Sequence, residues 1–126
     1  DTPEGQVAVQ DLRPGMPIWT VDAWGARTEA FVLKTGSVPV PAGFDLVRLR
    51  LEDGRQILAS AGHPLADGRS LGDLLAGDTV DEVRVASVEQ VRATGPATYD
   101  VLPDGRTALY WANGILLQST LASLTP

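Results

Sequence analysis

The same short pattern occurs twice in this sequence, and the repetition constrains the fold more than any other feature. The segment Leu12–Ile18 has the pattern Leu-x-x-Gly-x-x-aliphatic, and Leu74–Val80 repeats it. Three more segment pairs recur in the same order: Val32–Gly36 with Val91–Gly95, Phe44–Leu46 with Tyr99–Val101, and Asp53–Arg55 with Asp104–Arg106. Four ordered matches predict a duplicated unit whose two copies pack together and bury a face that neither could bury alone. The alternative is that turns in β proteins converge on glycine and Asp-Gly independently.

The segments between the turn residues are short and indicate strands. Val47, Leu49 and Leu51 alternate with charged residues, as in a half-buried strand, and Asp53-Gly54 can turn the chain back into Gln56–Ala59. Six similar runs are expected to be strands: Val7–Val9, Ile18–Asp22, Ala30–Leu33, Val83–Val91, Thr98–Leu102 and Ile115–Leu117. Most of the chain therefore favours an all-β fold.

Two local signals add detail to the all-β prediction. Asn113-Gly114 tolerates the positive φ that a tight hairpin turn demands, so a second hairpin is expected there. The best helix candidate is Ser70–Leu75, one or two turns long, with Ser70 as N-cap and Asp73 in the capping-box position.

The tryptophans are expected to fill the core rather than to bind ligands: Trp19, Trp24 and Trp111.

Length and composition narrow the classes of function. A chain of 126 residues predicts a single domain, 1–126, and a net charge of −6 disfavours nucleic-acid binding. No cysteine and one histidine exclude disulfides, thiolate zinc sites and multi-histidine metal sites, and no feature indicates a cofactor.

The carboxylates Asp78, Asp81 and Glu82 are expected to lie in a solvated turn. No membrane insertion is expected, and the charge permits a monomer. The start at Asp1, without an initiator methionine, suggests a piece cut from a longer precursor.

His63 is the first candidate for acid or base chemistry. It is the only side chain whose ordinary pKa lies near neutrality, and it follows the predicted strand Gln56–Ala59. Ser60, three residues earlier, can hydrogen-bond the imidazole or a substrate carbonyl. A serine-hydrolase site is disfavoured because no serine lies in a Gly-x-Ser-x-Gly elbow. Without further context, a structural role for a lone histidine is the leading alternative.

These segments, taken together, resemble the Hedgehog/intein (Hint) domain family, in its bacterial intein-like form. The resemblance covers nearly the whole chain, because five segments match the family's conserved blocks in order. They are Gly5–Thr20, Ser60–Leu65 as a Thr-x-x-His block with Ser60 in the Thr position, Leu74–Val80, Thr98–Val101 and Trp111–Leu117. The family fold implied is an all-β horseshoe of about a dozen short strands in two interleaved, pseudo-symmetric halves. The termini are then expected to approach each other beside His63.

The chemistry implied by the resemblance is an intramolecular acyl shift. In the family, a Cys, Ser or Thr at the first position of the domain attacks the preceding carbonyl and replaces the peptide bond with a thioester or ester. His63 would then help to protonate the amide nitrogen, and Ser60 would stabilise the distorted peptide. The domain would act on its own flanking polypeptide, as a single-turnover, self-cleaving unit.

Three departures from the family pattern limit the activity that the resemblance implies. The family places its nucleophile upstream of the turn at Pro3–Gly5, so this chain lacks it and is expected to be inert as given. Gln118 and Ser119 replace the His-Asn pair at the C-terminal junction, so splicing is not expected. The additional histidine of the family also has no counterpart in 106–111. Cleavage at the N-terminal junction is the activity that remains.

Two other functions stay open from the sequence. The chain can be a Hint-like module that keeps the fold but serves only as a structural or binding element of a secreted, extracellular multidomain protein. It can also be an unrelated β-barrel that binds a small ligand. Residues upstream of the junction separate the first of these from self-cleavage, because only cleavage needs a nucleophile there.

Overall fold

A computed structural model describes residues 1–41, 43–93, 95 and 97–121 of the chain. Within them lie nine strands, two short 3-10 helices and no α-helix. Every strand pairing is antiparallel. The predicted all-β class is therefore confirmed. No helix in the described part of the chain is long and apolar enough to cross a membrane.

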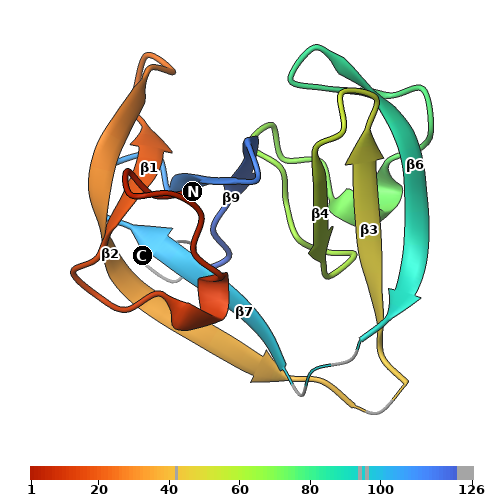
Figure 1. Ribbon diagram of the computed structural model, residues 1–126, viewed down its shortest axis with the longest axis horizontal. Helices are drawn as coiled ribbons and strands as arrows, with labels where there is room; N and C mark the ends of the chain where they lie inside the picture. Colours follow the sequence, from red (N-terminus) through yellow and green to blue (C-terminus); the bar gives the residue numbers. More distant parts are fainter. Residues whose placement is uncertain (42, 94, 96, 122–126) are drawn as a thin grey trace.

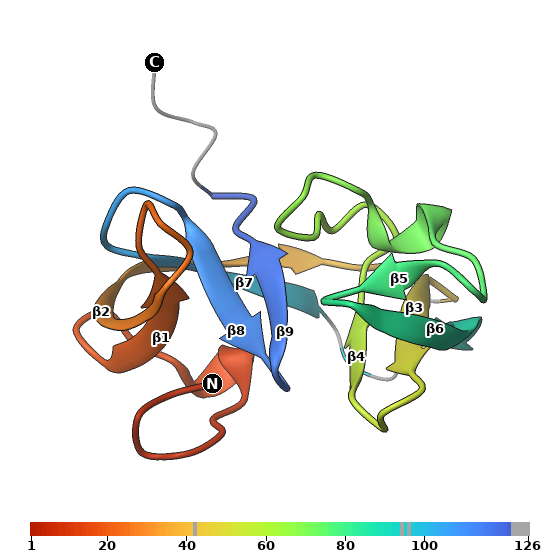
Figure 2. The ribbon, with the colours of Figure 1, turned by 90° about the horizontal axis from the view of Figure 1, so that it is seen from above.

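Two sheets form the two arms of a U-shaped molecule (Figure 1). The first has the order β1-β2-β7, with β1 at Pro17–Val21, β2 at Arg27–Pro39 and β7 at Ala97–Pro103. The second has the order β4-β3-β6-β5, and its strands are β4 (Gln56–Ala59), β3 (Asp45–Leu51), β6 (Val83–Arg92) and β5 (Thr79–Val80). A hairpin of β8 (Leu109–Ala112) and β9 (Ile115–Gln118) lies between the arms (Figure 2).

The two copies of the repeat exchange strands. The first copy runs through β1, β2 and β3, and the second through β5, β6 and β7. In the first sheet β2 pairs with β7, and in the second sheet β6 pairs with β3. Each sheet therefore contains the first two strands of one copy and the third strand of the other, and the second sheet also contains β4. The expected interleaving of two pseudo-symmetric halves is confirmed.

The Leu-x-x-Gly segments of the two copies also have the same local geometry. Leu12 and Leu74 each follow a 3-10 helix, η1 (Val9–Asp11) and η2 (Leu71–Asp73), and both side chains are buried. Gly15 and Gly77 come three residues later, with φ of 91° and 95°. The N–H of each glycine donates to a carbonyl of a neighbouring strand, at 2.8 and 3.0 Å. The Leu-x-x-Gly pattern thus specifies a buried leucine, a left-handed glycine and the start of a strand in both copies.

One contiguous hydrophobic cluster contains residues from both sheets and from the central hairpin. Leu49 on β3, Leu71 in η2 and Ile115 on β9 have no exposed surface. Because burial of apolar surface is the main favourable contribution to folding, this shared core holds the arms and the hairpin in place.

Two predicted elements differ in the structure. Val7–Val9 is not a strand: Val7 and Val9 pack half-buried against the core without ladder partners, and Val9 begins η1. The alternating burial of residues 7–9 comes from packing against the hydrophobic core and not from pairing with another strand. The helix predicted at Ser70–Leu75 is reduced to the three residues of η2, and the Ser70 side chain makes no capping hydrogen bond. The described strands number nine, fewer than the dozen expected.

The expectation that all three tryptophans fill the core is wrong for Trp24. Its side chain is 90% exposed in the turn between β1 and β2. Asp22 closes that turn by accepting hydrogen bonds from the backbone of Trp24 and Ala26, both at 2.9 Å. The turn holds the ring away from the sheet. Trp19 and Trp111 are half-buried, and Trp19 stacks against Arg27 at 4.4 Å.

Candidate active site

His63 lies at the end of a tight turn after β4, and backbone bonds fix its position. The His63 N–H donates to the Ser60 carbonyl at 3.0 Å, and the His63 carbonyl accepts from Leu71 N at 3.0 Å. The next residue, Pro64, accepts from the N–H of Gln118 on β9 at 3.0 Å. Because proline restricts the residue before it to extended backbone, the chain leaves this turn directly along β9.

The imidazole of His63 faces the phenol of Tyr110 on β8. The Nε2 atom lies 3.2 Å from the Tyr110 hydroxyl oxygen, and the rings meet edge to face at 88°. The ring also makes a hydrogen bond with the backbone of Gln118, and the charge of Asp100 acts on it. Three strands, β7, β8 and β9, therefore each present one partner to the histidine.

Asp100 is the centre of the polar cluster behind His63. It is buried on β7, and its carboxylate receives four hydrogen bonds. The donors are Val101 N at 2.8 Å, the Tyr110 hydroxyl at 2.8 Å, Thr120 N at 2.7 Å and the Thr120 hydroxyl. A buried carboxylate needs such compensation, because an unpaired charge in the interior is costly. The cluster links His63 to the segment just after β9.

The site shifts the titration of its members. Burial lowers the pKa of His63 below its ordinary value of 6.5, although Asp100 and the Gln118 backbone act in the opposite direction. Burial, and then the charge of Asp100 and its hydrogen bond, raise the pKa of the Tyr110 phenol far above its ordinary value. The phenol therefore keeps its proton at any physiological pH. The imidazole is neutral near pH 7 and free to accept a proton.

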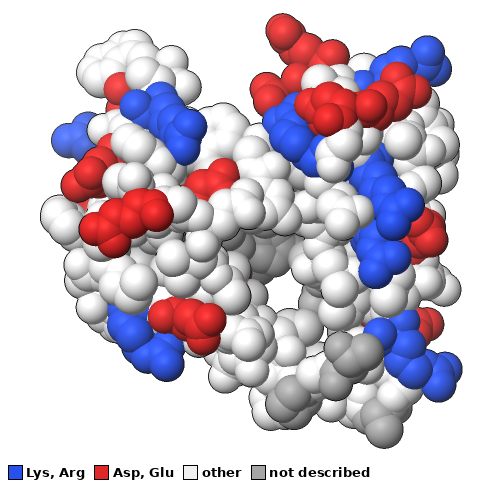
Figure 3. Space-filling model, viewed as in Figure 1, with Lys and Arg blue, Asp and Glu red and all other residues white. Residues whose placement is uncertain are grey.

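Two cavities meet at His63. The first, of about 250 Å³, is lined by His63, Tyr110 and Trp111 together with Asp1 and Val7. The second, of about 820 Å³, is lined by His63, Ser60, Asp100 and Thr120 among others. Most Lys, Arg, Asp and Glu side chains in Figure 3 lie on the outer parts of the arms, and the surface between the arms is mostly uncharged. His63 thus lines two cavities in a largely uncharged part of the surface.

Asp1 is bound beside this site by both β1 and β8. Its carbonyl accepts from Trp19 N at 3.0 Å, and its amine donates to the Trp111 carbonyl. Its carboxylate caps the hairpin turn by accepting from Asn113 N at 3.2 Å and Gly114 N at 2.9 Å. Asp1 therefore lies like one residue of a strand between β1 and β8.

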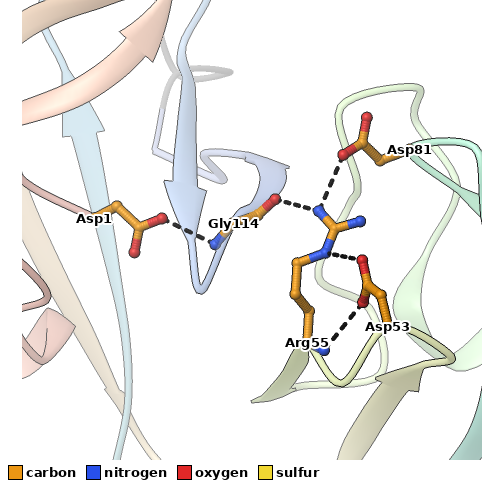
Figure 4. Close-up of polar contacts among 5 residues, drawn as sticks. All are labelled: Asp1, Asp53, Arg55, Asp81 and Gly114. Atoms are coloured by element: carbon orange, nitrogen blue, oxygen red, sulfur yellow. Dashed lines mark hydrogen bonds and ion pairs between the residues drawn. The ribbon is translucent and has the colours of Figure 1, made fainter.

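Arg55 connects the same turn to the other arm (Figure 4). Its Nη1 donates to the Gly114 carbonyl at 2.6 Å and to Asp81 at 3.0 Å, and its Nε pairs with Asp53 at 2.8 Å. Asp81, which the sequence suggested was merely solvated, takes part in an ion pair. The hairpin turn is therefore held from the first arm by Asp1 and from the second by Arg55.

The structure brings together most of the residues that the sequence singled out. Ser60 lines the larger cavity with His63, and its hydroxyl makes no hydrogen bond to the described residues. Gln118 contacts the His63 ring through its backbone. Ser119 is buried, with its N–H on the Ala108 carbonyl at 2.9 Å and its hydroxyl accepting from Leu121 N at 3.1 Å. Their roles in a reaction stay predictions.

Sequence reasoning missed Asp100 and Tyr110. The available signal was an acidic residue inside the predicted strand Thr98–Leu102, where a carboxylate on the buried face requires partners. The described residues contain no group of three or more His, Asp or Glu side chains arranged to hold a metal ion. The polar groups gathered at the site are suited to moving protons and to hydrogen-bonding a peptide.

No protein-family model matches the sequence. The curated proteins likewise give no match.

Solved structures do match, over most of the chain. A bacterial intein-like domain from Clostridium thermocellum has a TM-score of 0.77 at 22% identity, covering 93% of this chain and 91% of that one. A DnaB intein from Synechocystis sp. PCC 6803 has a TM-score of 0.74 at 18% identity, covering 94% and 89%. A consensus-engineered intein with an atypical split site has a TM-score of 0.63 at 25% identity, covering 81% of each chain. The fold resemblance drawn from the sequence is therefore confirmed.

Proposed function

This chain has the Hint fold of inteins, and from it we propose that the domain performs autoprocessing at its N-terminal junction. The reaction is an acyl shift onto a Cys, Ser or Thr that precedes Asp1, followed by cleavage. The 126 residues from Asp1 onward are then inert alone, because they do not include that nucleophile. The substrate is the polypeptide attached to the domain itself.

One observation carries this proposal: His63 and Asp1 line the same cavity. The backbone nitrogen of Asp1 donates to the Trp111 carbonyl, one residue along β8 from Tyr110, which contacts His63. A polypeptide joined to Asp1 therefore starts at the cavity that His63 faces. Holding the reacting groups beside the histidine lowers the entropic part of the barrier.

The proton balance of the reaction fits a neutral histidine. The nucleophile attacks the preceding carbonyl, a C–S or C–O bond forms, and the C–N bond breaks. The proton that leaves the nucleophile ends on the new amine, and His63 carries it from one to the other as base and then acid. Water or an added thiol then releases the upstream polypeptide. The lowered pKa of His63 keeps the ring free to accept that proton near pH 7.

Ser60 has a supporting role in this proposal. Its hydroxyl lines the cavity beside His63 and makes no hydrogen bond within the described residues, so it is free to donate to the distorted peptide. At the other junction, Gln118 and Ser119 offer no asparagine to cyclise. Cleavage without splicing is therefore the expected outcome.

The test uses a precursor with three parts in order. A reporter domain comes first, then the residues upstream of Asp1 with a nucleophilic Cys, Ser or Thr among them, and then the 126-residue chain. Intact-mass spectrometry should detect cleavage that speeds up with added thiol. His63→Ala should slow cleavage about 100-fold or more, since proton transfer by a positioned side chain contributes about that much. Ser60→Ala should slow it about tenfold, through loss of one hydrogen bond.

Two controls make the result specific. Replacing the upstream nucleophile with Ala should abolish cleavage, whereas Trp24→Ala, at an exposed turn, should cleave like the wild type. A wild-type precursor that stays intact for days with thiol present contradicts the proposal. That outcome favours the non-catalytic structural or binding module.

A further inference from the structure

We infer that Tyr110 is the positioning residue for His63, holding the imidazole by accepting a hydrogen bond from its Nε2 atom. The inference rests on the proposed function for its consequence in catalysis. The way in which the His63 ring is held does not depend on that function. It follows from the hydrogen bonds around the phenol oxygen of Tyr110.

The phenol oxygen of Tyr110 has two side-chain neighbours, Asp100 and His63. A tyrosine hydroxyl has one proton to donate and can also accept. The Asp100 carboxylate, with four donors directed at it, acts as an acceptor, so the phenol proton goes to Asp100 Oδ1 at 2.8 Å. The 3.2 Å contact between the phenol oxygen and His63 Nε2 can then be a hydrogen bond only if Nε2 donates.

The phenol is held too firmly to reverse this arrangement. Tyr110 is 5% exposed on β8, and its ring belongs to the hydrophobic core cluster. Asp100, its acceptor, is anchored by the backbone of Val101 on β7 and by Thr120 beyond β9. Burial and Asp100 raise the pKa of the phenol, so its proton stays in place. The phenol oxygen therefore presents a fixed acceptor to the imidazole.

This arrangement fixes the orientation of the ring. The groups that face the ring are the Asp100 charge from β7, the Tyr110 phenol from β8 and the Gln118 backbone from β9. With Nε2 donating to Tyr110, the proton of the neutral ring is held on Nε2. Tyr110 thus positions the imidazole without touching the substrate.

The first experiment uses the 126-residue chain and needs no cleavage. The chain contains one histidine, so nuclear magnetic resonance of the ring nitrogens gives a single titration. In the wild type, neutral His63 should carry its proton on Nε2 with slowed exchange. In Tyr110→Phe, that exchange should accelerate and the pKa of His63 should fall further, because an acceptor that favours the charged ring is gone.

The matched control is Tyr99→Phe, the same substitution at the other tyrosine of the chain. Tyr99 is 39% exposed, one residue before Asp100, and its hydroxyl makes no hydrogen bond to the described residues. Its variant should titrate like the wild type. Circular dichroism checks that both variants fold. A wild-type ring protonated on Nδ1 overturns the inference even if Tyr110→Phe does not fold, and so does a Tyr110→Phe variant that titrates like the wild type.

The second experiment repeats the comparison in the cleavable precursor. Tyr110→Phe should slow cleavage about tenfold or more and shift its pH profile with the pKa of His63, while Tyr99→Phe should do neither. If the wild-type precursor does not cleave, the proposed function fails, and the ring titration still decides how His63 is held. If the wild type cleaves and Tyr110→Phe cleaves equally fast with the same pH profile, the function stands and this inference fails.

Discussion

His63 lies between opposing electrostatic influences, and their balance determines the pKa of its imidazole. Burial disfavours the charged imidazolium, whereas the charge of Asp100 and the Gln118 backbone favour it. Burial prevails, and the pKa of His63 is lowered. The same burial keeps the Tyr110 phenol protonated. The site therefore pairs a neutral imidazole with a hydroxyl that keeps its proton, and this pairing suits the proposed proton transfer.

The lowered pKa of His63 predicts how stability changes with pH. In the unfolded chain the pKa of this histidine is near 6.5, so below that pH the unfolded state binds more protons than the native state. The contribution of His63 to the free energy of unfolding is complete above pH 6.5 and is lost as pH falls toward the native pKa. Denaturant titrations between about pH 5 and pH 8 should show this slope for the wild type.

The variant His63→Gln provides the comparison, because glutamine does not titrate. All other titrating groups are common to both proteins, so the difference between the two free energies of unfolding isolates His63. That difference should favour the wild type more at pH 8 than at pH 5. Parallel curves over this range would mean that the histidine is not buried as the structure has it.

The residues of the site differ in how far the sequence could predict them. The sequence could single out His63 as a candidate because it is the only histidine, and Ser60 because it precedes His63 in a recognisable block. Asp100 and Tyr110 could not be singled out, because their roles depend on β7 and β8 lying next to the turn at His63. Those contacts join positions 37 and 47 residues apart, such as His63 with Tyr110, and no local pattern specifies them.

At the scale of elements, the turn Asn113-Gly114 shows a local prediction that holds. Both residues have positive φ, 49° and 76°, and they join β8 to β9 as a tight hairpin, as expected. The sequence did not reveal that this turn is also tied to Asp1 on one side and to Arg55 on the other. Turn chemistry is local, whereas the groups that hold the turn come from distant parts of the chain.

Gly114→Ala should destabilise the fold more than an ordinary glycine substitution. Alanine at a φ of 76° is strained, and the added Cβ would lie 3.1 Å from Cδ of Arg55, whose guanidinium bonds the Gly114 carbonyl. Gly25→Ala is the matched control, with φ of 84° and open space around its Cβ. We expect a loss of about 1–2 kcal/mol for Gly25→Ala and about 1 kcal/mol more for Gly114→Ala. Equal losses in thermal or denaturant unfolding would show that the Arg55 contact is not tight.

At the scale of the whole molecule, the strand exchange makes the two arms interdependent. β7 of the second copy completes the first sheet, and β3 of the first copy lies inside the second sheet. The ordered matches in the sequence could predict the repetition. They could not predict which strand of each copy joins the sheet of the other copy, because exchanged and unexchanged strands have the same alternation of apolar residues. Since neither sheet is complete without both copies, the arms should unfold together.

Leu49→Ala tests this cooperativity, because the tryptophans and the mutation lie in different parts of the molecule. Trp19 and Trp24 belong to β1 and its turn and Trp111 to β8, whereas Leu49 is fully buried on β3 in the second sheet. Removing a buried leucine side chain should cost about 2–5 kcal/mol. If the arms form one cooperative unit, tryptophan fluorescence should report that loss in full as a lower denaturant midpoint.

The control for this experiment is Leu75→Ala, since Leu75 follows η2 and is 70% exposed. It should change the free energy of unfolding by less than about 0.5 kcal/mol. Circular dichroism, which reports on both sheets, should give the same midpoint as fluorescence for the wild type and for each variant. A fluorescence midpoint that stays at the wild-type value in Leu49→Ala, while circular dichroism shows an earlier transition, would mean that the arms unfold separately despite the exchange of strands.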